Sequence, residues 1–484
     1  MDYPKKVLHW IDDRETEPQR GKFFDKYDPA TGEKLTEVAG GTAEDAEKAI
    51  GGVHRGYERW RKIPVLDRAK ILRQAALLIQ ERKEELAEVI AQECGKSKKD
   101  ARSEIEAAVE CGFFFAGEGQ RYNGVVLPSG ADRRTISLIR QSMGVGALIT
   151  PFNNPAAGIA WKLFPALLCG NAVVIKAHEY TPYTPVLYAK IFREAGVPAD
   201  VISVVQGSGS GVGAPLIADR NVKFVSFTGS VETARFILKE TANRLAKVLI
   251  EAGGKNPFVV CDDADLNRAV EWAVKSAFVD AGQRCAAASR IIVMNTIYDD
   301  FLRLFLEKVK QLRAGTNDTD DFGAIISEPR LNAILKAVNS AVSRGAELLS
   351  GGNRVDRPGY FMEPTVISSV SPDDDISQSE LFGPVVCIYR AKYFSEAVML
   401  AKSSPFRLTA AIHTKNMDRA QEFINEFQGG VVRVNGPTHG SEPHVPFGGL
   451  GISGNGWREP GFAALDFYSE WKQVSIDYHS TREF

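Results

Sequence analysis

A cysteine and a glutamate, each among small residues, are the side chains of this sequence best suited to covalent chemistry. Cys285 ends the run Gly-Gln-Arg-Cys, and Glu251 opens the run Glu-Ala-Gly-Gly-Lys. A cysteine attacks as its thiolate and needs an activating environment and a partner to do so. Each residue alone has an ordinary explanation, because most cysteines are buried small side chains and most glutamates lie at the surface. Their function therefore depends on whether the fold brings both into one site.

An asparagine between two prolines could supply the hydrogen-bond donor that attack on a carbonyl requires. Asn153 and Asn154 lie between Pro151 and Pro155, after a predicted strand and before a predicted helix. The amide of Asn153 could donate to a developing oxyanion. An asparagine that merely caps the helix would give the same pattern, so both interpretations stay open at this point.

Charged residues and glycines at the ends of predicted strands indicate a nucleotide site. Lys176 and Glu179 follow a buried strand, at the edge where open α/β sheets bind ligands, and could bind ribose hydroxyls or phosphate. Two turns could hold a pyrophosphate: one contains Gly209, and the other, with Gly229 and Ser230, opens a helix with free amides. Charged residues also end buried strands simply to reach water.

Composition excludes several classes of function. The 484 residues are 44% hydrophobic, which is enough for more than one domain. The net charge is -2, no basic stripe is present, and no apolar run is long enough to span a bilayer. The six cysteines form no C-x-x-C pair, and the seven histidines show no metal-ligand spacing. We therefore expect a cytoplasmic protein with no metal site and no nucleic-acid or membrane partner.

Regular alternation of strands and helices predicts an α/β protein with parallel sheets. Helices are predicted over residues 42–94, with a break at Pro64, and 98–118, and strands then alternate with helices over 145–228. A second alternating block begins near residue 258 and continues to a helix over 330–344. Residues 371–375 and the glycine-rich stretch 429–461 are predicted as loops.

Three extended segments fall outside both blocks. Residues 125–128, 134–141 and 467–478 have the pattern of exposed strands. An unpaired strand edge usually finds a partner. We therefore expect a ribbon that joins subunits into a homodimer or homotetramer.

Several short motifs, taken in order, resemble those of the aldehyde dehydrogenase superfamily over nearly the whole chain. The resemblance implies that Cys285 is the nucleophile, Glu251 the base and Asn153 the oxyanion donor, and it places Lys176 at the catalytic site. It also matches Glu-Leu-Phe-Gly-Pro from Glu380 and Pro-Phe-Gly-Gly at residues 446–449. The turn at Ser230 is favoured over the loop at Gly209, which does not cradle the pyrophosphate in the usual Rossmann manner in this family. The implied cofactor-binding residues are Thr150, Pro151, Phe152, Lys176, Glu179, Gly209, Phe227, Gly229, Ser230, Gly253, Glu380 and Phe382.

The resemblance also implies a fold and a reaction. The fold would comprise a Rossmann-like doubly wound cofactor domain (residues 1–121 and 143–253), an α/β catalytic domain (254–452), a return segment (453–465) and a small β oligomerisation ribbon (122–142 and 466–484). The reaction would be NAD-dependent oxidation of an aldehyde to a carboxylic acid, through a thiohemiacetal and a thioester on Cys285 that water activated by Glu251 hydrolyses. Glu179 favours NAD over NADP, because a carboxylate repels a 2'-phosphate. The alternatives are a CoA-acylating semialdehyde dehydrogenase, which needs no such base, and a binding protein without turnover, which would be expected to lose the thiol or the base.

Four predicted substrate-binding residues depart from the aromatic tunnel of relatives that oxidise apolar aldehydes. Asn154 and Glu118 stand where aromatic residues are common, and His444 lies in a loop that often supplies another. Arg284, beside Cys285, could hold a distal carboxylate with its planar guanidinium. Alternatively, Arg284 points away and pairs locally, for example with Glu118. We therefore predict a short polar aldehyde, such as an anionic semialdehyde, as the substrate.

Overall fold

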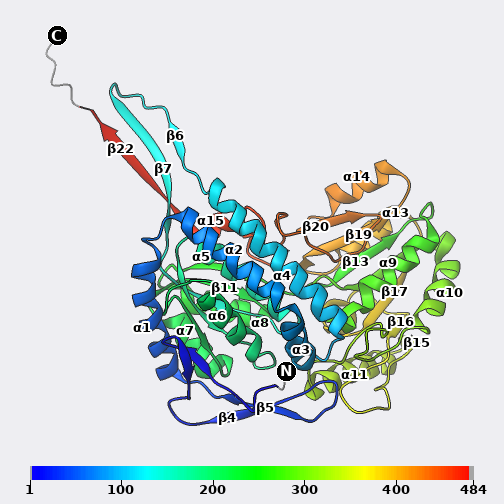
Figure 1. Cartoon of the computed structure of the whole chain (residues 1–484). Coiled ribbons are helices and arrows are strands. Elements are labelled where there is room, and N and C mark those ends of the chain that lie inside the picture. The colour runs from blue at the N-terminus through cyan, green and yellow to red at the C-terminus, as the bar shows by residue number, and fades with distance from the viewer. Residues whose placement is uncertain (1–2, 479–484) are drawn as a thin grey trace.

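The computed structural model describes residues 3–478 and contains two seven-stranded sheets and a three-stranded ribbon (Figure 1). Two further small sheets have the strand orders β1-β5-β4 and β18-β21. Their strands are β1 (Lys6–Val7), β4 (Phe23–Tyr27), β5 (Lys34–Ala39), β18 (Phe406–Arg407) and β21 (Leu450–Gly451). The predicted α/β class is therefore confirmed.

The first large sheet has the order β12-β11-β8-β9-β10-β2-β3. Its five parallel strands and their helices follow the predicted alternation: β8 (Val145–Ile149), α5 (Pro155–Leu168), β9 (Ala172–Lys176), α6 (Tyr183–Glu194), β10 (Ile202–Val205), α7 (Ala214–Ala218), β11 (Val222–Thr228), α8 (Val231–Ala242) and β12 (Lys247–Glu251). The sequence analysis did not predict the antiparallel edge, β2 (His9–Ile11) and β3 (Arg14–Thr16). These strands of three residues are too short to show a periodicity.

Helices from the amino-terminal third pack beside this sheet. They are α1 (Ala43–Trp60), α2 (Val65–Glu81), α3 (Lys83–Cys94) and α4 (Lys98–Glu118), and α4 contacts α2, α3 and α5. Thr42 and Asp45 form a capping box at the start of α1, and Gly95 ends α3 in the left-handed conformation with φ 67°. Helix α3 therefore ends at Gly95, as predicted. The residues that follow, from Lys96 onward, lie close to the candidate active site.

The second large sheet has the order β15-β16-β17-β14-β13-β19-β20. Its elements are β13 (Asn256–Val260), α9 (Leu266–Phe278), β14 (Ala288–Met294), α10 (Tyr298–Val309), α11 (Glu328–Ser343), β15 (Glu347–Ser350), β16 (Thr365–Ser368), α12 (Asp375–Gln378), β17 (Val385–Ala391), α13 (Phe394–Lys402), β19 (Thr409–His413), α14 (Met417–Glu426) and β20 (Val431–Val434). The prediction of one long loop over 429–461 was wrong, because β20 and β21 lie within it. Pairing of β20 with β19 supplies the main-chain hydrogen bonds that a four-residue valine-rich run cannot supply alone.

The ribbon is made of β6 (Val125–Leu127), β7 (Arg134–Ser142) and β22 (Ser469–Asp477), which follows α15 (Ala464–Tyr468). It projects away from both large sheets (Figure 1). The three predicted extended segments therefore pair with one another, and side chains such as Val126 and Trp471 are exposed on them. Residues 479–484 of the predicted ribbon segment, and residues 1–2 of the predicted cofactor domain, lie outside the described residues.

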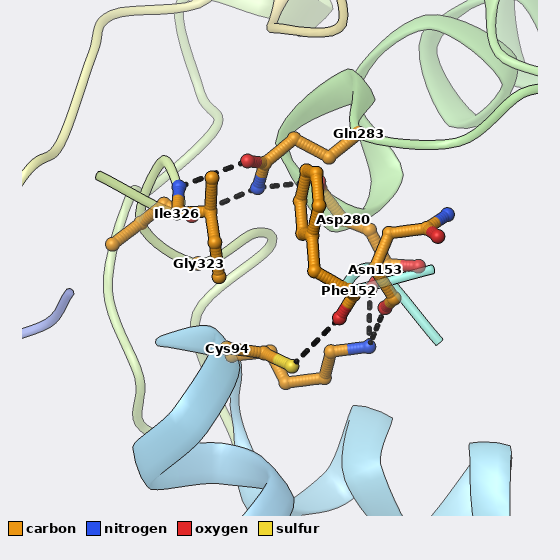
Figure 2. Close-up of a pocket in the computed structure, with 9 residues that line it drawn as sticks. Cys94, Phe152, Asn153, Asp280, Gln283, Gly323 and Ile326 are labelled. Atoms are coloured by element: carbon orange, nitrogen blue, oxygen red, sulfur yellow. Dashed lines mark hydrogen bonds and ion pairs between the residues drawn. The ribbon is translucent and has the colours of Figure 1, made fainter. Parts of the chain in front are cut away.

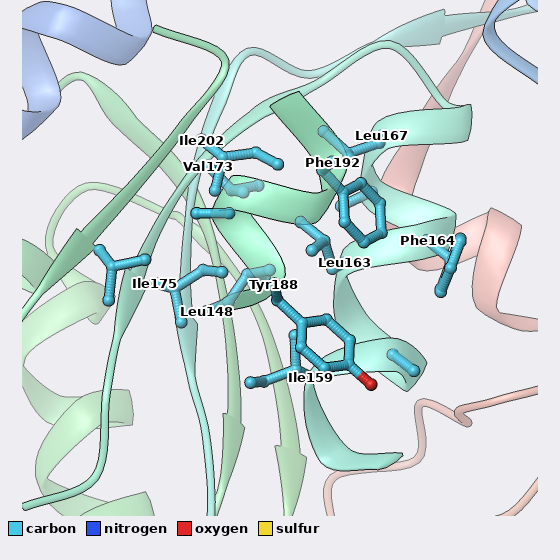
Figure 3. Packing of buried hydrophobic residues seen from close by; sticks show 14 of the residues in the cluster. Leu148, Ile159, Leu163, Phe164, Leu167, Val173, Ile175, Tyr188, Phe192 and Ile202 are labelled. Atoms are coloured by element: carbon cyan, nitrogen blue, oxygen red, sulfur yellow. The ribbon is translucent and has the colours of Figure 1, made fainter. Parts of the chain in front are cut away.

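A densely packed apolar core fixes the strand ends that carry the site. Leu148, Val173 and Ile175 from β8 and β9 pack against Ile159 and Tyr188 from α5 and α6, all with no exposed surface (Figure 3). Close packing of this kind leaves little freedom for the residues that follow β8 and β9. Within residues 3–478, no helix is long and apolar enough to cross a membrane.

Candidate active site

Cys285 lies on a tightly bent segment between α9 and β14. The three residues Asp280, Ala281 and Gly282 all have left-handed backbone conformations, with φ of 54°, 56° and 65°. Gln283 anchors the bend, because its side chain donates to the Ala324 carbonyl at 2.9 Å and accepts from the Ile326 N–H at 2.9 Å. Cys285, at the end of this bend, is a partly exposed residue, whereas the five other cysteines are buried.

Burial, together with the nearby carboxylates of Glu380 and Glu251, raises the pKa of the Cys285 thiol to about 12. The N–H of Ala286 and the charge of Arg284 oppose this effect. A Cβ atom at Gly254 would lie 2.5 Å from the Cys285 carbonyl oxygen, and the Gly254 N–H donates to Glu380 at 3.0 Å. The fold therefore brings together the predicted nucleophile, the segment that begins with the predicted base Glu251, and one predicted cofactor residue. The thiol is therefore protonated at neutral pH until a base or a ligand changes its surroundings.

We expect the rate of Cys285 alkylation by iodoacetamide to rise about tenfold per pH unit from roughly pH 7 to pH 10, because the thiolate fraction does so below the pKa. Mass spectrometry of the alkylated peptide measures the rate. The five buried cysteines serve as internal controls. A rate that levels off below pH 9 would contradict a raised pKa.

Glu251 ends β12 and presents a buried carboxylate. The residue is 5% exposed, and neither carboxylate oxygen has a hydrogen-bond partner within residues 3–478. Burial and the nearby Glu459 raise the pKa of Glu251 well above its usual range, and Lys162 and Arg458 oppose this shift. A Cβ atom at Gly448 would lie 2.4 Å from Oε1 of Glu251, so the predicted Pro-Phe-Gly-Gly motif packs directly on the carboxylate. A raised pKa makes the deprotonated carboxylate a stronger base.

A buried polar network lies next to Glu251. Lys162, in the middle of α5, bonds to Glu459 and to the Ser226 hydroxyl, and the Tyr468 hydroxyl donates to Glu459 at 3.0 Å. Lys162 and Glu459 were not among the predicted site residues. A usable signal was present, because Lys162 is the single charged residue of the otherwise apolar helix α5.

Asn153 lies in the turn between β8 and α5. Its main-chain carbonyl accepts from Lys96 Nζ at 2.8 Å, and its side chain points away from that ammonium (Figure 2). Asn154 is the N-cap residue of α5 but its side chain makes no capping hydrogen bond. The carboxylate of Glu104 accepts from the N–H groups of Ala156 and Ala157 at 2.7 and 3.2 Å instead. The alternative of an asparagine cap therefore fails, and the amide of Asn153 is free of that role.

The neighbouring Phe152 belongs to an aromatic cluster. Its ring makes edge contacts with His178, Tyr180 and Phe382, at centroid distances of 5.2, 6.2 and 5.5 Å. Phe382 adopts a positive φ of 54°, which is unusual for a bulky residue. The loops after β8 and β9 therefore meet the segment that carries Glu380 and Phe382.

The predicted ribose pair lies together at the carboxyl end of β9. Lys176 Nζ lies 3.0 Å from Glu179 Oε1, and Lys176 is buried whereas Glu179 is partly exposed. Burial lowers the pKa of Lys176, and Lys176 in turn lowers the pKa of Glu179 against the effect of burial. Thr150 and Pro151 follow β8 on the adjacent strand end.

The two predicted pyrophosphate turns differ in their hydrogen bonding. Ser230 caps α8 and accepts from the N–H of Thr233 at 3.3 Å. The prediction of free amides at this turn was partly wrong, because the N–H of Gly229 donates to the Glu251 carbonyl at 3.0 Å. The other turn, from Gly209, is a π-helical turn capped by Ser208. Phe227 is buried in β11, and a Cβ at Gly229 would meet its ring at 2.6 Å.

Glu380 packs on the two glycines that follow Glu251. Its Oε1 accepts from the N–H of Gly254 at 3.0 Å, and a Cβ at Gly253 would lie 2.0 Å from its Oε2. Burial raises the pKa of Glu380 to about 7, although Gly254 and the charges of Arg330 and Lys255 lower it. Only glycine at position 253 allows this carboxylate to approach the main chain.

The predicted substrate residues have separate partners. Arg284 is paired with Asp280, and Glu118 is paired with Arg121, whose Nε lies 2.6 Å from Oε1. The alternative that Arg284 forms a local salt bridge is therefore confirmed, but its partner is Asp280 and not Glu118. His444 is exposed and lies 3.7 Å from Glu442. Asn154 is partly exposed at the start of α5.

Comparisons with known proteins agree with this geometry. The family model described as the aldehyde dehydrogenase family matches residues 16–474. The alpha-ketoglutaric semialdehyde dehydrogenase of Bacillus subtilis is 36% identical, covering 97% of this chain and 98% of its own. The retinaldehyde dehydrogenase 3 of Rattus norvegicus is 37% identical, covering 95% and 91%. The crystal structure of betaine aldehyde dehydrogenase from Staphylococcus aureus in complex with NAD+ superposes with a TM-score of 0.95 at 32% identity, covering 99% and 97%. The chain therefore belongs to the aldehyde dehydrogenase family of oxidoreductases.

Proposed function

We propose that this enzyme uses NAD to oxidise a short anionic semialdehyde to a dicarboxylic acid, with hydrolysis of a thioester on Cys285. The observation that supports the proposal most directly is that the segment opened by Glu251 packs against Cys285, which follows Arg284 along the chain. The relative from Bacillus subtilis, named for a semialdehyde substrate, supports the same substrate class.

The residues around the strand ends fit a dinucleotide. The pair Lys176 and Glu179 suits ribose hydroxyls, the N-terminus of α8 at Ser230 suits a phosphate, and Glu380 suits the second ribose. The partly exposed carboxylate of Glu179 would repel a 2'-phosphate, which favours NAD over NADP. When bound, NAD supplies the hydride acceptor of the reaction.

The chain's own residues would carry the remaining chemistry. Cys285 releases its proton to solvent water as its Sγ bonds to the aldehyde carbon, and the Asn153 amide with the Cys285 N–H would hold the oxyanion. Loss of hydride from that carbon leaves a thioester on Cys285. Glu251 then takes a proton from water as the water attacks the thioester, which releases the acid and returns the thiol.

The surroundings of Cys285 favour a substrate with a negative charge. Asp280 engages Nε of Arg284, which leaves the two terminal guanidinium nitrogens for a carboxylate. Asp280 offsets part of the charge of Arg284, and Glu118 is paired with Arg121, so recognition of a carboxylate would rest on hydrogen bonds from the terminal guanidinium nitrogens. Retinaldehyde dehydrogenase 3, named for an apolar aldehyde, is comparably identical, so overall similarity does not decide the substrate.

We expect Arg284→Ala to raise KM for 2,5-dioxopentanoate and succinic semialdehyde about 10- to 100-fold, because charged hydrogen bonds of about 1.5–3 kcal/mol are lost. KM for propanal should change less than about twofold. NADH formation across this panel measures the KM for each aldehyde. For the anionic aldehydes, the KM of Arg284→Lys, which keeps the charge, should lie between those of wild type and Arg284→Ala. The control is Arg102→Ala, which removes an exposed arginine paired with Glu84 and Asp318. Equal loss for neutral and anionic aldehydes would contradict a role in carboxylate recognition.

The predicted division into domains and the assembly remain parts of the same proposal. Each large sheet has its own set of helices, and residues 453–454 pair with the end of β12, which supports a return segment to the first sheet.

The exposed apolar side chains of the ribbon, such as Val126 and Trp471, support a homodimer or homotetramer formed through β6, β7 and β22.

A further inference from the structure

A buried ammonium lies between the two loops that carry the proposed chemistry. Lys96, the residue after the glycine that ends α3, is 6% exposed. It lines a small cavity together with Phe152, Asn153, Asp280 and Gln283 (Figure 2).

Lys96 has a partner on each side of this cavity. Its Nζ donates to the main-chain carbonyl of Asn153 at 2.8 Å, and it lies 4.0 Å from Oδ1 of Asp280. The other carboxylate oxygen of Asp280 accepts from Arg284, next to the nucleophile. A single cation therefore links the turn that carries Asn153 to the bend that carries Cys285.

The far side of Lys96 is anchored by a third element. Nζ lies 3.0 Å from Oε2 of Glu104 in α4, and Oε1 of the same carboxylate accepts from the N–H of Ala156 at the start of α5. Glu104 thus fixes both the ammonium and the helix that follows the Asn153 turn. Glu104 and Asp280 raise the pKa of Lys96 despite its burial, so the amine stays charged at all relevant pH values.

We propose that Lys96 is a positioning residue that sets the distance between the Asn153 amide and Cys285. Lys96 holds Asn153 by its main-chain carbonyl. The side-chain amide of Asn153 points away from that carbonyl and is left free (Figure 2). Its charge also offsets that of Asp280, whose left-handed backbone starts the bend before the thiol. The proposal rests on the proposed function, since it assumes that the Asn153 amide stabilises an oxyanion.

A purely structural salt bridge would contain the same contacts, so the test must separate the two. A positioning role predicts that Lys96 acts through Asn153, and a structural role predicts a loss that does not depend on Asn153. A double-mutant cycle between these positions distinguishes them.

We expect Lys96→Met to lower kcat about 10- to 100-fold for neutral and anionic aldehydes alike, because a displaced donor stabilises the oxyanion poorly. The KM for aldehyde and the Kd for NAD, measured by fluorescence quenching, should change less than about twofold. In an Asn153→Ala background, the same substitution should lower kcat less than about twofold. Lys96→Gln, which keeps a donor but not the charge, should lie between wild type and Lys96→Met.

The matched control is Lys98→Met, which removes a lysine two residues away that forms an exposed pair with Glu88. Thermal unfolding and circular dichroism establish that each variant is folded, and Lys96→Gln carries the same test if Lys96→Met does not fold. The proposal is overturned if kcat falls equally with and without Asn153, or if it stays within twofold of wild type. Failure of the proposed function gives a different result, because Asn153→Ala alone would then retain full activity.

Discussion

Replacing Cys285 with alanine is expected to lower aldehyde-dependent NADH formation at least about 10⁴-fold, because no other thiol in the site can form the covalent intermediate. The five remaining cysteines are buried, and their thiols are not presented to solvent. Alanine differs from cysteine only by the sulfur atom, so the bend fixed by Gln283 should persist. The rate is measured by NADH absorbance with wild type and variant at equal concentration.

Two further measurements make this result specific. NAD binding to the Cys285→Ala variant should stay within about twofold of wild type, because the predicted cofactor residues lie on other strand ends. Cys261→Ala, at a buried cysteine that follows β13, should retain nearly full activity. Residual turnover of more than about one per cent in Cys285→Ala would show that another group attacks the aldehyde.

The fold could be predicted where the sequence pattern is long and regular. Buried strands such as β9 (Ala172–Lys176) carry continuous apolar runs and are separated by helices of ordinary length, so the α/β alternation was visible in the sequence. The short strands β2 and β20 were not visible in the same way. Both depend on hydrogen bonds with other strands, β10 and β19, and that pairing leaves no pattern within the short strand itself.

The identity of the site residues could be predicted better than their partners. Motifs identify Cys285 and Glu251 because small residues surround each of them. The structure explains the small residues: Gly253 leaves room for the carboxylate of Glu380, and Gly448 leaves room for that of Glu251. The partner of Arg284 could not be predicted. Asp280 is four residues away in sequence, and only the left-handed backbone between them brings its carboxylate to the guanidinium.

Long-range buried charges were the hardest feature to predict. Lys96 and Lys162 each bind groups that are more than 50 residues away in sequence, so no local spacing links them to the site. Burial nevertheless requires partners for both, because an unpaired buried ammonium is very unfavourable. A lysine next to a helix stop or inside an apolar helix is therefore a useful sign of a buried network.

Replacing Glu251 with glutamine is expected to abolish turnover while leaving the first half of the reaction intact. The variant should release about one NADH per active site in a rapid burst, because Cys285 and Asn153 remain, and the steady-state rate should then fall about 10²- to 10⁴-fold, because no base activates water. Glutamine has the shape of glutamate, and within residues 3–478 the Glu251 carboxylate has no hydrogen bond to lose. Stopped-flow absorbance measures the burst, and mass spectrometry detects the acyl group on Cys285.

The same variant separates hydrolysis from acyl transfer to CoA. Wild type should give free acid without CoA, at a rate that increases as the pH rises through the raised pKa of Glu251, since only the deprotonated carboxylate accepts a proton. In Glu251→Gln, a small thiol such as cysteamine should restore turnover by attacking the thioester directly, because a thiolate does not need this base. Glu459→Gln is the matched control: it removes a neighbouring negative charge that raises the pKa of Glu251, so the pH profile should shift to lower pH with the burst unchanged. Wild-type NADH formation that requires CoA would instead favour the acylating alternative and assign Glu251 a structural role.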